Sequence, residues 1–123
     1  MLEEKIMDLE TVRNYCLKKK GVFESLPFDE DTPVYKVAGK IFLLASIIPP
    51  ISINIKCDPE KAVELREQFE AVTPGYHMNK LHWNTILLEN SIPDKLIFNW
   101  IDDSYNLVSE GLPKKDKKLI FRN

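Results

Sequence analysis

The sequence of 123 residues predicts one compact α+β domain, in which helices pack on an antiparallel β-sheet. Apolar residues recur at three- and four-residue steps near both ends of the chain, as in amphipathic helices. Short apolar runs separated by tight-turn residues lie between them, as in strands joined by hairpins. The expected order of elements is α-β-β-β-β-α-β-α, in a single domain over residues 1–123.

Length, composition and charge narrow the class of protein. With 44% hydrophobic and 29% charged residues, the chain has the composition of a globular domain. The formal net charge of −2 means that any nucleic-acid site has to be a local basic patch. No apolar run is long enough to span a bilayer, no secretory signal is visible, and two cysteines make no disulfide framework. We therefore expect a cytoplasmic protein without membrane association.

The first element is predicted to be a helix that ends near Lys18–Lys20, where positive charge suits the helix dipole. Asp8 is a candidate N-cap, which would leave residues 1–6 as an extension; the alternative is one helix from about residue 3. Gly21 can take a left-handed position behind the helix. The apolar stripe consists of Leu2, Ile6, Leu9, Val12 and Cys16.

Four strands are expected next. The first is predicted over residues 23–28, and the next two, over 34–37 and 40–47, flank a tight turn at Ala38-Gly39. The fourth, over 51–56, alternates, so its isoleucines should face the core. Its other side is expected to be a polar outer face, made of Ser52, Asn54 and Lys56.

The second half should contain a helix, a strand and a long helix. Asp58-Pro59 supplies an N-cap and a proline at the first helical position, so a helix should run to about Glu70. Thr73-Pro74-Gly75 should break the chain, and a strand is expected over residues 83–88. The long helix should open at residues 91–94 and end at Gly111, followed by a basic tail over 114–123. Its predicted apolar face comprises Ile97, Trp100, Ile101, Tyr105 and Val108.

Residues 73–83 concentrate the side chains that could form a functional site. Both histidines, a tyrosine, a lysine and one of the two tryptophans lie there, between a predicted helix and a predicted strand. Amphipathic rings and titratable groups on a loop are typical of binding surfaces.

The same segment carries a family resemblance. The block Pro74-Gly75-Tyr76-His77-Met78-Asn79-Lys80-Leu81-His82-Trp83 is the most specific of a series of motifs in the same order along the chain. The others are Tyr15-Cys16-Leu17, Pro27-Phe28, residues 34–42, residues 54–60, Ile92-Pro93-Asp94, residues 101–105 and residues 111–115. With them the chain resembles the MmcQ/YjbR family of small bacterial proteins. The resemblance implies a fold like that of CyaY (the frataxin type) and a "double wing" DNA-binding role, with no established catalytic residue or cofactor.

Metal and catalytic sites are not favoured by the sequence. His77 and His82 are five residues apart, which is not the four-residue spacing of a helical ligand pair, and no Cys-x-x-Cys is present. Cys57 precedes a helix start and could be a nucleophile, but Asp58 beside it opposes the thiolate, so a buried structural cysteine is favoured. No phosphate-binding glycine loop is present. We expect a non-enzymatic protein without metal or cofactor.

Lysines and the aromatic-basic loop are the candidate nucleic-acid contacts. Lysines attract phosphates, and aromatic rings can stack on exposed bases, although surface lysines are more often only a solvated face. The candidate residues are Lys36, Lys40, Lys56, Tyr76, His77, Lys80, His82, Lys114 and Lys115, with Lys117, Lys118 and Arg122 in the tail. We expect weak, mostly non-specific DNA binding by a monomer or weak dimer. The alternative is a protein-interaction or small-ligand-binding module that uses the same loop.

Overall fold

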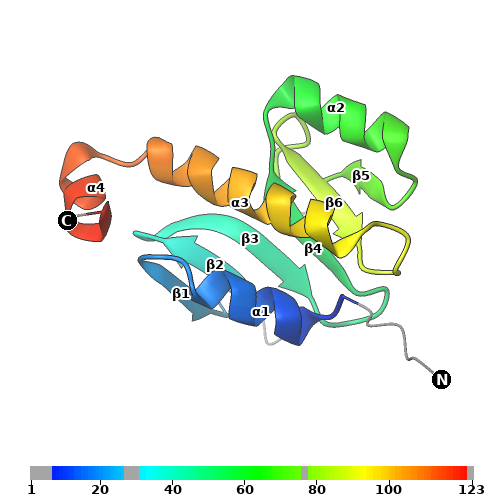
Figure 1. The fold of residues 1–123 in the computed structure, drawn as a ribbon, viewed down its shortest axis with the longest axis horizontal. Coiled ribbons are helices and arrows are strands. Elements are labelled where there is room, and N and C mark those ends of the chain that lie inside the picture. Colours follow the sequence, from blue (N-terminus) through cyan, green and yellow to red (C-terminus); the bar gives the residue numbers. More distant parts are fainter. Residues whose placement is uncertain (1–6, 27–30, 76–77, 122–123) are drawn as a thin grey trace.

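A six-stranded antiparallel sheet with the order β1-β2-β3-β4-β6-β5 organises the chain (Figure 1). This computed structural model describes residues 7–26, 31–75 and 78–121. The strands are β1 (Val22–Ser25), β2 (Val34–Val37), β3 (Lys40–Ser46), β4 (Ser52–Lys56), β5 (Val72–Pro74) and β6 (Trp83–Leu87). The helices are α1 (Leu9–Leu17), α2 (Pro59–Gln68), α3 (Asp94–Glu110) and α4 (Lys114–Phe121). The predicted α+β class is confirmed.

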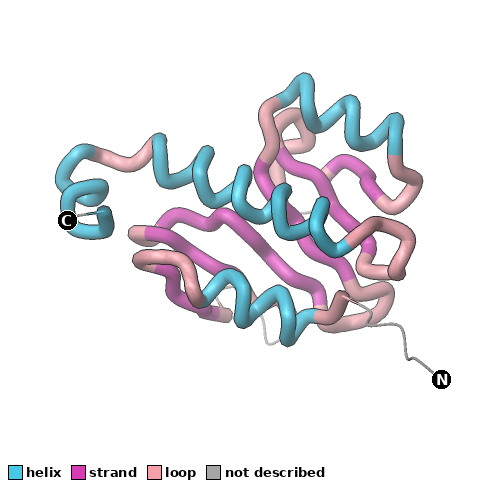
Figure 2. Tube along the Cα trace, viewed as in Figure 1, coloured by secondary structure: helices cyan, strands magenta, loops and turns pink. Residues whose placement is uncertain are grey.

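Helices α1, α2 and α3 lie on one face of the sheet, and α4 lies at the end of the molecule beside the C-terminus (Figures 1 and 2). The main core fills the space between the sheet and these helices. All five predicted apolar residues of α3 are buried there: Ile97, Trp100, Ile101, Tyr105 and Val108. The amphipathic pattern therefore identified the packed face of the long helix correctly.

Two helix starts follow the predicted caps. Asp8 accepts a hydrogen bond from the Thr11 amide (2.8 Å), so α1 begins at Leu9 and the alternative of one helix from residue 3 is wrong. Asp58 accepts a bond from the Glu60 amide (3.2 Å), with Pro59 as the first residue of α2. The proposed extension over residues 1–6 lies outside the described residues.

Two elements were not predicted. Residues 72–74 form the edge strand β5, although Thr73-Pro74-Gly75 was expected to break the chain. Pro74 is tolerated because an edge strand has one side on which no amide needs a ladder partner. The predicted basic tail is also largely a helix, α4, which Ile120 anchors to the main core.

The polar side of β4 is buried, which corrects the prediction of a solvated outer face. Ser52 and Asn54 point away from α1–α3, as the alternation requires, yet both are buried. The Thr85 hydroxyl on β6 donates to the Asn54 side-chain oxygen (2.7 Å), so these two buried side chains are hydrogen-bonded to each other. A second, smaller apolar cluster on this face contains Val34, Leu44 and Trp83.

A bulge gives the sheet a local opening between β3 and β4. Tyr35 pairs with Leu43 and Lys36 with Ile41, so Phe42 is an extra residue on β3. Pairing of β3 with β4 begins only at Leu43–Ile55. The Ser104 hydroxyl of α3 enters the opening, where it donates to the Phe42 carbonyl (2.5 Å) and accepts from the Lys56 amide (2.8 Å). One side chain thus replaces the missing ladder bonds.

Gly75 is required because the backbone approaches β6 closely at this position. Its amide donates to the Trp83 carbonyl at 2.7 Å, and a Cβ placed on it would lie 2.7 Å from the Trp83 Cβ. That distance is shorter than ordinary van der Waals contact, so the backbones would have to move apart. Gly75 therefore lets two backbones meet, where the sequence suggested a turn.

A polar cluster joins α1 to α3. The Tyr15 hydroxyl donates to the Asp102 carboxylate (2.8 Å), and Lys19 forms an ion pair with the same group (2.5 Å). The Lys19 ammonium also lies about 5 Å from the ring centres of Tyr15 and Tyr105. Burial and the bond to Asp102 raise the pKa of Tyr15 to about 12, and burial raises the pKa of Cys16 to about 12.

We expect the free energy of unfolding to fall at alkaline pH. The folded state favours the neutral Cys16 thiol, whose ordinary pKa is 9.0, so this contribution is complete below pH 9 and is lost as the pH rises toward 12. Urea unfolding between pH 7 and pH 11 measures the effect. The Cys16→Ala variant should be less stable at pH 7, and its free energy of unfolding should fall less steeply above pH 9. A free energy of unfolding that stays constant to pH 11 would contradict this.

Gly75→Ala should destabilise the fold by roughly 1–3 kcal/mol, the usual cost of overpacking. The matched control is Gly111→Ala, because a Cβ there would meet its nearest atom at an ordinary 3.6 Å. Thermal and urea unfolding of the two variants provide the measurement. If the two variants have equal free energies of unfolding, β5 and β6 can move apart at Gly75 without loss of stability, which would contradict the prediction.

Candidate nucleic-acid interface

Residues 78–82, which precede β6, are held in place by Arg66 of α2. The Arg66 Nε donates to the Asn84 side-chain oxygen (2.7 Å), and its guanidinium also donates to the Lys80 carbonyl. Asn84 is fully buried and donates in turn to the Ala62 carbonyl (3.2 Å). Helix α2 therefore positions residues 78–82 through a connected hydrogen-bond network. Arg66 was not among the predicted residues, because its role depends on a contact between distant segments.

The candidate residues of this segment have different environments. Tyr76 and His77 lie outside the described residues. Lys80 is exposed, and His82 is half-buried, with its carbonyl accepting a bond from the Cys57 amide (2.6 Å). Trp83 is buried in the second apolar cluster, so it anchors β6.

Lys40 and Lys56 line one hollow, of about 480 Å³, at the opening between β3 and β4. Ile41 and Met78 also line it, together with Leu107, Val108 and Gly111 at the end of α3. The hollow exists because the two strands separate at the bulge and Ser104 occupies the gap behind them. The structure therefore brings together two lysines that are sixteen positions apart in the sequence.

Lys36 lies on the sheet face opposite α1–α3. Its neighbours Tyr35 and Val37 belong to the main core, and side chains along a strand alternate between faces. Lys36 is directly opposite Phe23 on β1 and Ile41 on β3. Phe23 is 71% exposed, which is unusual for a phenylalanine within a sheet. The sequence prediction missed Phe23 as a site residue, although a strand was expected to begin there.

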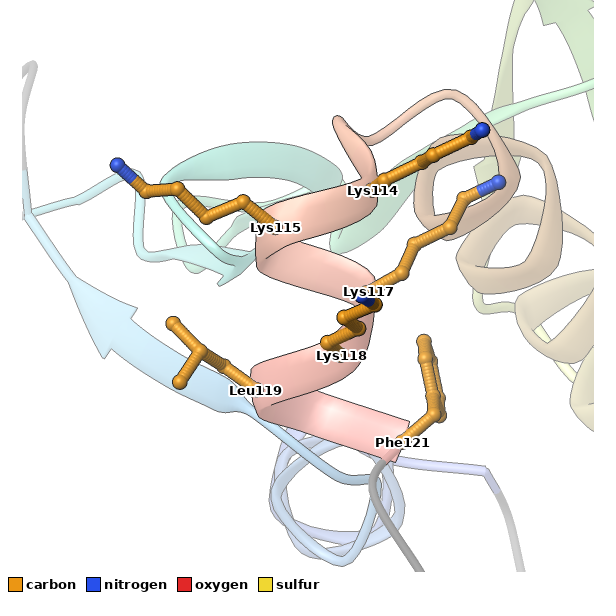
Figure 3. Close-up of a pocket in the computed structure, with 6 residues that line it drawn as sticks. All are labelled: Lys114, Lys115, Lys117, Lys118, Leu119 and Phe121. Atoms are coloured by element: carbon orange, nitrogen blue, oxygen red, sulfur yellow. The ribbon is translucent and has the colours of Figure 1, made fainter.

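Helix α4 presents four lysines. Lys114 and Lys117 extend to one side of the helix, while Lys115 and Leu119 extend to the opposite side (Figure 3). These lysines, with Leu119 and Phe121, line a hollow of about 770 Å³. Ile120 holds α4 against the start of β1, 3.0 Å from the position of a Cβ on Gly21.

The end of α1, the β2–β3 turn and α4 meet at the same end of the molecule (Figure 1). The Tyr105 hydroxyl on α3 donates to the Lys20 carbonyl (2.6 Å), and its ring lies 6.5 Å from that of Phe121. Gly39 and Gly111 line the same hollow, which places the turn beside the connection to α4. We call this region the basic end; its lysines are Lys18, Lys20, Lys36, Lys40, Lys56, Lys114, Lys115, Lys117 and Lys118.

The lysines of the basic end form no ion pair with another residue of the described ranges. The ion pairs between described residues are Arg13–Glu24 and Lys19–Asp102, and neither uses a lysine of the basic end. Glu110 and Asp116 are acidic exceptions in this region. Because the whole chain has a net charge of −2, the rest of the protein carries an excess of negative charge. The fold therefore separates charge between the basic end and the remainder.

The environment of Cys57 favours a structural role. The thiol is buried, and burial together with Asp103 raises its pKa to about 11, which disfavours the nucleophilic thiolate. Among the described residues, no group of three His, Cys, Asp or Glu side chains is placed to hold a metal ion.

None of the helices within the described ranges is long and apolar enough to cross a bilayer.

Comparison with known proteins identifies relatives over nearly the whole chain. The uncharacterized protein YbdF of Escherichia coli O157:H7 is 38% identical over 112 residues, covering 90% of this chain and 92% of that protein. The uncharacterized protein YjbR of Escherichia coli K12 is 32% identical over 117 residues, covering 94% and 99%.

Solved structures have the same fold. A Deinococcus radiodurans protein with a DUF419 domain superposes with a TM-score of 0.87 at 32% identity, covering 96% of this chain and 91% of that one. A Pseudomonas syringae protein superposes with a TM-score of 0.74 at 29% identity, covering 82% and 98%. The YjbR family model matches residues 17–107, which contain the sheet and most of α3. The chain belongs to the YjbR family, as its sequence motifs indicated.

Proposed function

We propose that this protein binds nucleic acid, without catalysis, through the basic end. The observation that supports the proposal is that Lys40 and Lys56 line one hollow beside the connection to α4, a helix with four more lysines, in a protein whose net charge is −2. Lysines that only keep a protein surface solvated do not need to be clustered in this way. A local cluster of cations is what a polyanion recognises, because each lysine–phosphate contact releases a condensed counterion.

The geometry favours several phosphate contacts made from a rigid protein scaffold. Lys36, Lys40 and Lys56 project from a sheet, and α4 is anchored by Ile120, so little backbone order has to be gained on binding. The β2–β3 hairpin is closed by a tight two-residue turn, in which Ala38 (48°) and Gly39 (79°) both have positive φ. We assign this hairpin as one wing of the "double wing" role that the family resemblance implies. Ammonium groups on phosphates carry no base sequence information, so the binding should be largely non-specific.

Replacement of the two lysines of the hollow by glutamate should weaken binding and flatten its salt dependence. For the double variant Lys40→Glu/Lys56→Glu, the slope of log K against log salt concentration should decrease by about 0.7–0.9 for each phosphate that is no longer neutralised. The measurement is fluorescence anisotropy of a labelled oligonucleotide at several salt concentrations.

The matched control for this experiment is Lys61→Glu/Lys95→Glu, which changes the net charge equally on α2 and α3, away from the basic end. It should leave the slope nearly unchanged. Equal weakening in both double variants would indicate a general charge effect. Absence of any salt-sensitive binding by the unaltered protein at low ionic strength would refute the proposed function.

A second candidate function, binding of a small polar ligand, is supported by a groove of about 550 Å³ beside β5. Its lining includes Pro49, Pro50, Ser52, Asn54, Pro74 and Thr85. Buried hydroxyl and amide groups between apolar walls are typical of small-molecule sites. Thr73 and Pro74, the first two residues of the segment 73–83, line this groove, which links it to the alternative predicted from the sequence.

A thermal-shift screen of metabolites tests this second candidate. A ligand at about 100 times its Kd adds roughly 2.7 kcal/mol to the free energy of unfolding, which raises the melting temperature measurably. Thr85→Val removes the hydroxyl that donates to Asn54, so it should abolish the shift. A shift that persists in this variant would place the ligand elsewhere.

A further inference from the structure

We infer that the nucleic acid bound by the basic end is single-stranded, and that Phe23 stacks on one of its bases. This inference rests on the proposed function and adds the form of the ligand to it. It follows from the position of Phe23 on the sheet, which the sequence did not single out.

Phe23 begins a row of side chains that crosses the sheet on the face opposite α1–α3. Strand pairing places Phe23 opposite Lys36, and Lys36 opposite Ile41. Ile41 and Lys56 line the hollow between β3 and β4, and Lys56 is paired with Trp83 on β6. We call these residues the cross-strand row: Phe23, Lys36, Ile41, Lys56 and Trp83.

The aromatic members of the cross-strand row have different roles. Trp83 is 7% exposed and packs with Val34 and Leu44, so its ring belongs to the second apolar cluster. Phe23 is 71% exposed and belongs to neither described apolar cluster. The free energy of folding gains little from such a ring, because it remains in water. Its exposure beside Lys36 suits an aromatic contact with a ligand.

The acidic neighbour of Phe23 does not oppose an anion on this face. Glu24 is adjacent in β1 and therefore points to the helix side of the sheet. Its carboxylate accepts bonds from the Arg13 Nε (3.1 Å) and the Tyr35 hydroxyl (2.6 Å). Among the described residues, the charged side chain directly opposite Phe23 is that of Lys36.

An exposed ring beside lysines distinguishes single strands from duplexes. In a duplex, both faces of each base are covered by neighbouring bases, so a phenylalanine has no ring face to contact. In a single strand, a base can turn out and stack on an aromatic side chain while lysines hold the phosphates. The cross-strand row supplies both groups on adjacent strands, about 5 Å apart. Stacking does not depend on the sugar, so DNA and RNA single strands are both suitable ligands.

The test compares fluorescein-labelled (dT)15, (rU)15 and a 15-base-pair DNA duplex in anisotropy titrations at one salt concentration. The unaltered protein should bind at least one single strand about tenfold more tightly than the duplex. The preferred single strand distinguishes DNA from RNA. Phe23→Leu should weaken single-strand binding about tenfold and leave duplex binding unchanged, because leucine is apolar but cannot stack. Phe23→Trp should restore the affinity.

The control variant is Val63→Ala, which changes a 45% exposed apolar residue on α2, away from the cross-strand row. It should bind every probe like the unaltered protein. The inference is overturned if the duplex binds as tightly as both single strands, or if Phe23→Leu retains full single-strand affinity. In both cases salt-sensitive binding can persist, so the proposed function would survive. A complete absence of salt-sensitive binding, in contrast, would refute the proposed function itself.

Discussion

The Ser104 hydroxyl of α3 holds the two halves of the sheet together at the point where they separate. Strands β3 and β4 stop pairing beyond Leu43 and Ile55, so a carbonyl and an amide would remain buried without partners there. Ser104 accepts from the Lys56 amide and donates to the Phe42 carbonyl, which satisfies both groups. The helix is thereby tied to both strands, and the opening persists as a hollow instead of closing into a regular ladder. These two hydrogen bonds fix the backbone of Lys56, which lines that hollow together with Lys40.

Charge separation in this protein is a consequence of topology. The lysines of the basic end come from segments that are up to one hundred residues apart in the sequence, and the acidic residues other than Glu110 and Asp116 are distributed over the remainder. Apolar contacts join these segments, with Ile120 beside Gly21 and the ring of Phe121 near that of Tyr105, and the Tyr105–Lys20 hydrogen bond adds to them. Core packing therefore provides the free energy that places like charges near one another, against their mutual repulsion. Such a cost is understandable where the cluster serves to bind a polyanion.

Local sequence patterns identified some residues of the candidate site and missed others. Lys36, Lys40 and Lys56 were identified because a hairpin turn and an alternating strand indicate where side chains project, and the structure places Lys40 and Lys56 around one hollow. Lys114 and Lys115 were assigned to a tail, since a helix of eight residues with four lysines has too little apolar periodicity to be recognised. Arg66 and Phe23 were missed. Their roles arise from contacts with Asn84 and from exposure beside Lys36, and neither is encoded by local spacing.

The sequence by itself determined the α+β class, the caps at Asp8 and Asp58, the hairpin at Ala38-Gly39, the buried face of α3 and membership of the YjbR family. These features depend on residues close together in the chain, where periodicity and side-chain hydrogen bonding act directly. Only the tertiary structure decided that Ser52 and Asn54 are buried, that Gly75 allows two backbones to meet, and that residues 114–121 pack as a helix beside β1. Each of these depends on a partner segment distant in sequence, whose position follows from the packing of the whole core.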